Sequence, residues 1–215
     1  MSAHRLELDG PEQTQIGRRS GLYALLSKAF RFPSQEQYER VKSGQFADEV
    51  QQALSQLPYN GLKADTLGRG TGLSCDEFQS RYIELFEVGG QHGPPCFLYE
   101  GEHGGGRMKV LEEVLRFYHY FGLRLSQEKR DRPDHLASEL EFMHLLTFKE
   151  ADCLLQRKER GAYLKAERDF LCFHVNGFAA RVAEEVGGSA VPFYSGLAQL
   201  GAAFCQSELA YLQAA

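Results

Sequence analysis

Residues 133–143 read PDHLASELEFM, and this stretch decides the fold. Proline at position 133 suits the first position of a helix, and we expect a long helix from there to about Lys158. Small or apolar side chains recur every three to four residues, which places them on one helix face. These positions are Leu136, Leu140, Met143, Thr147, Ala151 and Leu154. The spacing predicts a helix that packs one face against the rest of the chain.

The composition extends this expectation to the other segments. The 215 residues include 28 leucines but only 15 β-branched residues, counted as Val, Ile and Thr. Strands favour β-branched side chains and helices favour leucine, so the ratio argues against a sheet protein. We therefore expect an all-α fold, although the 22 glycines are many for a pure helix bundle.

Periodic apolar residues and helix-start signals predict further helices on both sides of this stretch. Their expected ranges are 13–30, 35–43, 46–57, 75–86, 107–121, 164–186 and 192–212. The glycines concentrate in two intervening loops, at 59–73 and 87–106. The predicted fold is a single-domain helical bundle over residues 1–215 with long Gly/Pro-rich loops, in which residues 1–12 form a flexible N-terminus.

Charge and cysteine content exclude several classes of protein. A net charge of −5 gives no electrostatic footprint for nucleic acid. No run approaches the roughly 20 apolar residues that span a bilayer, so membrane insertion is not expected. The five cysteines are odd in number and lack C-x-x-C spacing, which fits reduced thiols in a cytoplasmic protein. The glycines at 68–72 follow no strand and precede no P-loop lysine, so no nucleotide site is expected.

Arg18-Arg19 and the leucines that follow loosely resemble a twin-arginine export signal. The resemblance fails in detail, because Lys28 and Arg31 interrupt the apolar stretch and no small-residue cleavage site follows. We therefore expect an ordinary first helix with arginines on its outer face.

Glu141 and His144 have the E-x-x-H spacing that di-iron proteins use on one helix face. A di-iron centre needs a second such pair, and the other one in this chain, Glu100 and His103, lies in a glycine-rich loop. No cofactor is therefore expected. A helical metal-binding oxidoreductase that uses Glu141 and His144 is the alternative function.

A second group of potential metal ligands lies in and beside the loop at 87–106. His92, Cys96 and His103 could approach one another there, but their spacing matches no zinc module. The other four cysteines fall in or at the ends of predicted helices, where packed thiols are expected. Cys96 is therefore the cysteine best placed to be reactive.

Aromatic residues gather in the sequence around the same loop. They are Tyr82, Phe86, Phe97, Tyr99, Phe117, Tyr118, Tyr120 and Phe121. Most of them are expected in the core. A loop lined by aromatic rings and flanked by Glu100 and Glu102 would also form an apolar groove with acidic groups, which suits a peptide that carries arginines beside an apolar stretch.

Two motifs carry a resemblance to a known family. The first is YIELFEVG at 82–89, continued by Pro94-Pro95 and Tyr99-Glu100, and the second is the stretch at 133–143. In pattern, order and separation they resemble the TorD/DmsD/NarJ-type family of chaperones dedicated to molybdoenzymes. The stretch at 104–122 is most similar to the branch that serves selenate, chlorate, dimethyl sulfide or ethylbenzene-oxidising enzymes.

The resemblance implies a TorD-like helical fold and a cytoplasmic, non-enzymatic role. Such a chaperone binds the twin-arginine signal peptide or amino-terminal region of a molybdopterin-containing catalytic subunit. It assists cofactor insertion and holds back export until the subunit is mature. The expected partner is that subunit with its signal peptide, and long helices joined by loops also permit domain swapping into a homodimer.

The expected peptide-binding residues come from the two motifs and the aromatic cluster. They are Tyr82, Phe86, Pro95, Tyr99, Glu100, Tyr118, Asp134, His135, Glu139 and Met143. Asp134 is expected in the first turn of its helix, where the helix dipole favours a carboxylate. His135 and Glu139 are four residues apart and would share a face, so that these groups could bind the arginines of a signal peptide. In a second interpretation, Asp134 and His135 cap the helix and brace the loop.

Overall fold

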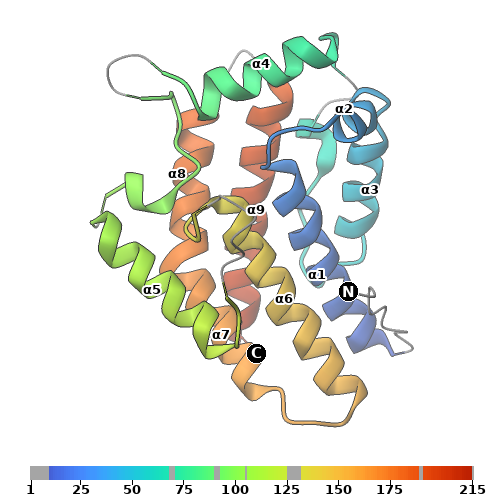
Figure 1. Ribbon diagram of the computed structural model, residues 1–215. Coiled ribbons are helices and arrows are strands. Elements are labelled where there is room, and N and C mark those ends of the chain that lie inside the picture. Colours follow the sequence, from blue (N-terminus) through green and yellow to red (C-terminus); the bar gives the residue numbers. More distant parts are fainter. Residues whose placement is uncertain are drawn as a thin grey trace.

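The expectation of an all-α fold is confirmed in a computed structural model of the chain (Figure 1). The structure describes residues 10–67, 71–89, 93–104, 106–124, 132–188 and 191–214. Its α-helices are α1 (Pro11–Ala29), α2 (Gln35–Lys42), α3 (Gln45–Leu54), α4 (Cys75–Phe86), α5 (Arg107–Tyr120), α6 (Leu136–Leu155), α7 (Gly161–Phe170), α8 (Asn176–Val186) and α9 (Pro192–Ala214). No strand forms within these described ranges.

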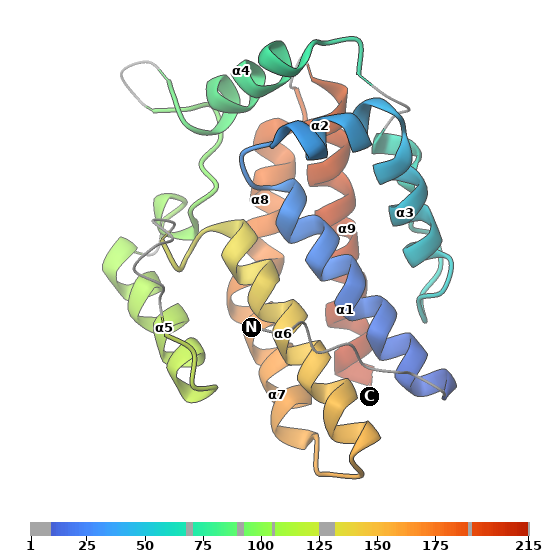
Figure 2. The same ribbon diagram turned by 45° about the vertical axis from the view of Figure 1, so that its right-hand side comes forward.

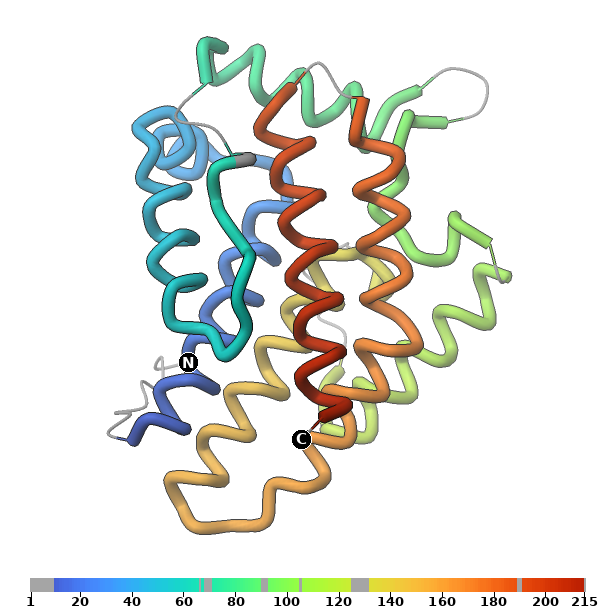
Figure 3. The backbone as a smooth tube through the Cα atoms, turned by 180° about the vertical axis from the view of Figure 1, so that it is seen from behind, coloured from blue at the N-terminus to red at the C-terminus, as the bar shows by residue number. Residues whose placement is uncertain are grey.

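The long helices form a bundle in which distant parts of the sequence lie side by side. α1 packs along α6, and α8 packs along α9, as Figures 1 and 2 show from two directions. α4 crosses one end of the bundle, and α5 lies on its outer side. On the opposite face, seen in Figure 3, a short 3-10 turn at Ala64–Leu67 lies against α9.

Side-chain caps fix where two of the shorter helices begin. The hydroxyl of Ser74 accepts a hydrogen bond from the backbone N–H of Glu77, and the Glu77 carboxylate accepts one from the backbone N–H of Ser74. This is the reciprocal capping box that the sequence predicts. Ser34 caps α2 by accepting from the backbone N–H of Gln37 at 3.2 Å. Both caps satisfy N–H groups that have no partner inside the helix, and they confirm the predicted starts.

Aromatic rings fill the core where α4 meets α9. Phe78 stacks on Tyr194 with ring centroids 5.1 Å apart, and Phe86 meets the same ring edge-on at 5.5 Å. Elsewhere in the bundle, Phe142 of α6 meets Phe170 of α7 edge-on at 4.7 Å. Such pairs add specific geometry to apolar burial, so the phenylalanines and tyrosines fix how the helices cross.

The start of α6 differs from the prediction. The helix begins at Leu136, three residues later than expected from Pro133. The N–H of Leu136 donates to the carbonyl of Leu98, and the N–H of Glu100 donates to the carbonyl of Asp134, each at 2.9 Å. This pairing holds a turn at residues 133–134 and the extended residue His135 beside the loop. Asp134 therefore precedes the helix and does not lie in its first turn.

Two other predicted segments also need correction. The helix predicted over 164–186 is divided into α7 and α8 by a π-helical turn at Leu171–Val175. The loop predicted at 59–73 contains the 3-10 turn at Ala64–Leu67, whose two end residues are buried. Residues 68–70, part of the glycine-rich stretch at which no nucleotide site is expected, lie outside the described ranges.

The predicted flexible N-terminus of residues 1–12 overlaps the first helix. α1 begins at Pro11, and the carboxylate of Glu12 pairs with Arg160 at 2.6 Å. Residues 1–9 lie outside the described ranges.

A buried arginine joins four helices of the bundle. Arg19 of α1 is fully buried, so the prediction of arginines on the outer face is wrong at this position. Its guanidinium pairs with Glu150 of α6 at 3.1 Å, Glu167 of α7 at 2.6 Å and Glu208 of α9 at 2.9 Å. The hydroxyl of Tyr59 also donates to Glu208, at 2.5 Å. A buried charge is stable only with such partners, and these partners lie far away in the sequence.

The Arg19 cluster holds more carboxyl groups than cations. From its more exposed position, Arg160 reaches Glu150 at 3.1 Å. Burial raises the pKa of Glu167 to about 8, despite the opposing effect of Arg19. Burial thus favours the neutral form of this carboxyl group, which would reduce the repulsion among the three carboxyl groups.

Replacing Arg19 by methionine should destabilise the fold strongly, because it leaves buried carboxylates without their cation. We expect Arg19→Met to lower the free energy of unfolding by about 3–5 kcal/mol, measured by urea denaturation. Arg81→Met is the control, because Arg81 and Glu84 form a pair at 2.7 Å with both side chains half exposed. That pair should contribute less than about 1 kcal/mol. Equal losses in the two variants would contradict the role assigned to Arg19.

Candidate functional site

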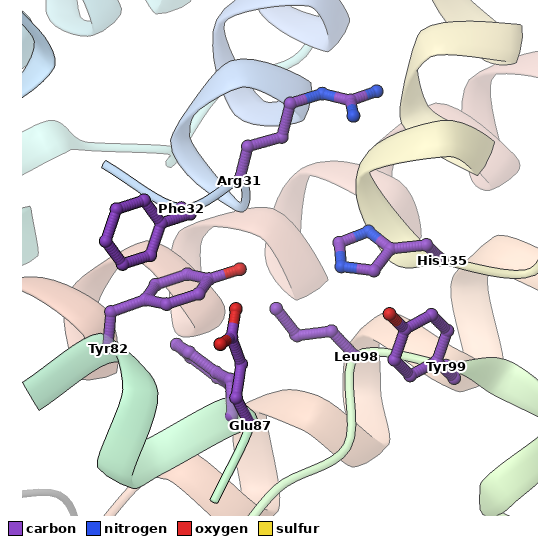
Figure 4. A pocket seen from close by; sticks show the side chains of 8 residues that line it. Arg31, Phe32, Tyr82, Glu87, Leu98, Tyr99 and His135 are labelled. Atoms are coloured by element: carbon purple, nitrogen blue, oxygen red, sulfur yellow. The ribbon is translucent and has the colours of Figure 1, made fainter. Parts of the chain in front are cut away.

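A pocket of about 230 Å³ opens where the end of α1, the end of α4, the loop at 98–99 and the start of α6 meet. Its lining residues are Arg31, Phe32, Tyr82, Phe86, Glu87, Leu98, Tyr99 and His135. Figure 4 shows the carboxylate of Glu87 and the ring of His135 directed toward the middle of the pocket from opposite sides. We call this the α1–α4 pocket.

The first wall of the pocket is built by the chain that leaves α1 and by α4. The hydroxyl of Tyr82 donates to the backbone carbonyl of Phe30 at 3.0 Å, which ties the two elements together. The ring of Phe32 meets Tyr82 edge-on at 5.7 Å and is 46% exposed. Phe32 thus presents an aromatic surface at the pocket, where an apolar side chain of a ligand can be desolvated.

The second wall is the seam between the loop and the start of α6. Tyr99 and His135 form an antiparallel bridge, and their rings meet edge-on at 5.0 Å. The Nδ1 atom of His135 accepts a hydrogen bond from the backbone N–H of Ala137 at 3.1 Å, which caps α6. The guanidinium of Arg132, in the segment before α6, lies over the ring of Tyr99 in the loop, 4.6 Å from the ring centroid. The seam therefore fixes both rings that line this side.

The charges at the pocket differ in how they are engaged. The Arg31 guanidinium pairs with Glu141 at 2.8 Å. Glu87 is exposed and makes no ion pair with another described residue. The α1–α4 pocket thus combines aromatic walls with an accessible carboxylate, a combination that can bind a cationic group beside an apolar one.

The ten residues predicted to bind peptide separate into three groups. Tyr82, Phe86, Tyr99 and His135 line the α1–α4 pocket. Tyr118, Asp134, Glu139 and Met143 are buried. Pro95 is exposed but is not among the lining residues, and Glu100 is partly buried. Direct contact with a peptide stays a prediction for all ten, and the pocket gives it a location for the first four.

Asp134 supports the loop from behind the pocket. Its carboxylate accepts two hydrogen bonds from the guanidinium of Arg132, at 3.0 and 2.6 Å, and one from the backbone N–H of Gly101 at 3.1 Å. A side chain at position 101 would begin 3.0 Å from Asp134 Oδ2 and 3.1 Å from the Cα of Arg107, so glycine permits this close approach. Asp134 is fully buried in this arrangement, which agrees with the interpretation that it braces the loop.

Glu139 is a buried carboxyl group that faces another carboxyl group. It is fully buried, and no described N–H or O–H group donates to either of its oxygens. Burial raises the pKa of Glu139 well above its ordinary value, and the neighbouring carboxylate of Glu100 adds to this effect. Glu100 in turn lies 3.0 Å from Nδ1 of His174 in the π-helical turn. His135 and Glu139 therefore do not share an acidic surface, because His135 lies before the helix and Glu139 points into the interior.

The residues of the alternative metal site have other partners. Glu141 pairs with Arg31 at the surface, and Nδ1 of His144 lies within 2.9 Å of the hydroxyl and carbonyl oxygens of Ser20. The described ranges contain no group of three or more His, Cys, Asp and Glu side chains arranged to hold a metal ion.

The three residues considered as metal ligands in and beside the loop do not form a site among the described residues. His92 lies outside the described residues. Cys96 is fully buried, and burial raises the pKa of its thiol well above the usual range, so the expectation that Cys96 is reactive is wrong. The ring of His103 lies 2.7 Å from the carbonyl oxygen of Phe97.

Four lining residues were not predicted from the sequence. They are Arg31, Phe32, Glu87 and Leu98. Glu87 lies inside the first family motif, and its exposed acidic side chain next to two buried aromatic positions was a usable signal. Phe32 lies between the end of α1 and Pro33, so it belongs to no helix and helical periodicity does not assign its ring to the core. Arg31 and Leu98 join the site through the tertiary fold alone.

Comparison with known proteins assigns the chain to a family. Residues 43–184 match the family model described as nitrate reductase delta subunit. The chain is 31% identical over 199 residues to the perchlorate reductase assembly chaperone protein of Dechloromonas aromatica (strain RCB), covering 89% of this chain and 88% of the relative. This chain belongs to that family. It is an assembly chaperone of the TorD/DmsD/NarJ type and not an enzyme, so the alternative of a metal-binding oxidoreductase is wrong.

Other relatives of this assembly chaperone carry similar names. It is 32% identical over 170 residues to the chlorate reductase assembly chaperone protein of Ideonella dechloratans, covering 78% of this chain and 74% of the relative. It is 36% identical over 105 residues to the selenate reductase assembly chaperone protein of Thauera selenatis, covering 48% and 54%. Both names fall within the branch that the sequence resembles. No helix in the described part of the chaperone is long and apolar enough to cross a membrane.

Glu139 should make the stability of the chaperone depend on pH. Above the ordinary glutamate pKa of 4.5, the unfolded chain loses this proton while the folded chain keeps it, so folding stability falls as pH rises. The loss can reach about 1.4 kcal/mol per pH unit. In Glu139→Gln, the side-chain amide can still donate a hydrogen bond to Glu100, but it has no carboxyl group to titrate. Urea denaturation at pH 5, 6.5 and 8 should therefore show the variant gaining stability relative to the wild type as pH rises.

The matched control for this prediction is Glu84→Gln, which changes an exposed glutamate of α4. Its stability should differ from that of the wild type by a constant amount across the same pH range. A constant difference for Glu139→Gln as well would show that the Glu139 carboxyl titrates normally in the folded protein.

Proposed function

We propose that this chaperone binds the twin-arginine signal peptide or amino-terminal region of the catalytic subunit of a molybdopterin-containing oxidoreductase. It acts in the cytoplasm, where it assists cofactor insertion and holds the subunit back from export until maturation is complete. Membership of the assembly-chaperone family supports a catalytic subunit as the partner. The α1–α4 pocket is the observation on which the location of the proposed binding site rests.

The chemistry of the α1–α4 pocket fits a peptide that carries arginines beside an apolar stretch. Glu87 offers an exposed carboxylate, to which an arginine of the peptide can donate in a bidentate pair. Phe32 offers a half-exposed ring, and Val88, which follows Glu87 in the chain, is 62% exposed. An apolar side chain that follows the arginines removes this surface from water when it binds.

Buried residues of the family motifs support the pocket and need not touch the peptide. Asp134 holds the loop at Gly101, and Glu139 lies beneath the same loop next to Glu100. A charge reversal at either position would disturb the wall that carries Tyr99 and His135. A loss of peptide binding in such variants would therefore report on the shape of the pocket.

Peptide binding is best tested at Glu87, because its side chain is exposed. We expect a synthetic signal peptide of the client to bind the wild type saturably in calorimetry, and Glu87→Arg to weaken binding about tenfold, or 1.4 kcal/mol. Glu84→Arg is the control, since it makes the same charge change one turn earlier on α4, away from the lining residues. It should bind like the wild type.

A second ligand separates charge pairing from other effects. A peptide in which both arginines are replaced by glutamine should bind the wild type weakly and lose little more in Glu87→Arg. Equal binding of the original peptide to the wild type and to Glu87→Arg would remove the pocket from the proposal. No binding of either the peptide or the full client subunit to the wild type would overturn the proposed function.

A further inference from the structure

A second groove lies between α5 and α7, and it shares no residue with the α1–α4 pocket. Its volume is about 360 Å³. It is lined by Arg116, Phe117, Tyr120, Phe121, Ala162, Lys165, Ala166 and Asp169. Figures 1 and 2 place α5 on the outer side of the bundle, away from α1 and the pocket beside it. We call this the α5–α7 groove.

The floor of the α5–α7 groove is apolar. Phe117 meets Phe170 edge-on at 5.1 Å, and Phe121 lies 5.4 Å from the ring of Tyr163, so the two helices are joined by aromatic contacts. The small side chains of Ala162 and Ala166 lie opposite and leave room above them. Tyr120 stands at the edge of the groove with 78% of its surface exposed.

Two further apolar side chains outside the groove are exposed on the elements that border it. On the α7 side, Phe173 follows Asp169 by four residues and is 69% exposed. On α5, Met108 near the start of the helix is 66% exposed, and it does not line the groove. Of these exposed apolar side chains, Tyr120 lies at the groove itself, and an exposed ring beside an apolar floor is typical of a binding site.

The charges around the α5–α7 groove favour an acidic partner. Asp169 is its one acidic lining residue, and this carboxylate already pairs with Lys165 at 2.8 Å and Arg168 at 3.4 Å. Arg116 is exposed and makes no ion pair with another described residue. The lining of the groove thus holds two cations, Arg116 and Lys165, and one carboxylate, on a protein whose net charge is −5. A local excess of positive charge on an acidic protein attracts carboxylates and repels arginines.

We propose that the α5–α7 groove is a second binding surface, which takes an acidic amphipathic helix from the client subunit outside its signal peptide. A groove between two helices with apolar residues along its length suits the apolar face of a third helix, and carboxylates flanking that face would pair with Arg116 and Lys165. The identity of the partner as the client rests on the proposed function. A basic signal peptide would be repelled here, so the two surfaces bind different segments without competing.

The test measures binding of the client subunit with its signal peptide removed. Calorimetry with the full-length chaperone should give about tenfold weaker binding for Arg116→Glu, because one charge pair is replaced by a repulsion worth at least 1.4 kcal/mol. Tyr120→Ser should also weaken binding, through loss of apolar contact alone. Lys149→Glu is the matched control, since it makes the same charge change at a half-exposed side chain of α6 outside the groove. All variants should keep the wild-type affinity for the signal peptide.

A charge exchange makes the test specific for the groove. A synthetic helix from the client that binds the wild type should bind Arg116→Glu more tightly once its glutamates are changed to lysine, and should then bind the wild type poorly. Wild-type affinity of Arg116→Glu for the subunit without its signal peptide would overturn the proposal. So would a chaperone dimer in sedimentation that dissociates in Arg116→Glu, because the groove would then hold a second copy of this chain.

The outcomes for the two surfaces can be told apart. Loss of signal-peptide binding in Glu87→Arg with retained binding of the remaining subunit would concern the α1–α4 pocket alone. If the signal peptide does not bind the wild type at all, but the remaining subunit binds in an Arg116-dependent manner, the assignment of the signal peptide to the α1–α4 pocket fails and the α5–α7 groove stands.

Discussion

The guanidinium of Arg19 is the contact on which the bundle depends. It is fully buried and binds carboxyl groups from α6, α7 and α9, so four helices meet at one group. Apolar contacts tolerate small sliding of one helix along another, whereas hydrogen bonds to a planar guanidinium do not. The cluster therefore sets the register of helices whose leucine-rich faces alone would permit several. The raised pKa of Glu167 favours its neutral form, which lowers the charge that this arrangement must bury.

The seam between the loop and the start of α6 forms one side of the α1–α4 pocket. Backbone hydrogen bonds at Leu98 and Glu100 hold the loop against the chain before α6, and the bridge between Tyr99 and His135 turns both rings toward the α1–α4 pocket. The same residues cannot be helical and paired with the loop at once. The family motif at 133–143 thus contains both the start of α6 at Leu136 and the preceding residues that form one side of the α1–α4 pocket.

The chaperone carries two surfaces of opposite electrostatic preference. The α1–α4 pocket presents Glu87, and the α5–α7 groove presents Arg116 and Lys165. Both surfaces expose aromatic rings, so in the proposed function apolar contact would supply affinity at each of them and charge would decide which segment binds. A chaperone that holds an immature enzyme gains from contacts at two separate places, because the second contact forms at a high effective concentration after the first.

Sequence alone determined the helices, most of their boundaries and the family, because apolar spacing, Ser74 and Ser34 caps and two motifs are local features. It also named four of the eight residues that line the α1–α4 pocket. The tertiary structure decided which charged groups are buried. Arg19 has the sequence context of a surface residue, and its burial depends on carboxyl groups as distant as Glu208. The accessible acid is likewise Glu87, while Asp134 is taken up by the loop, since long-range partners and not helical periodicity determine which carboxylates meet water.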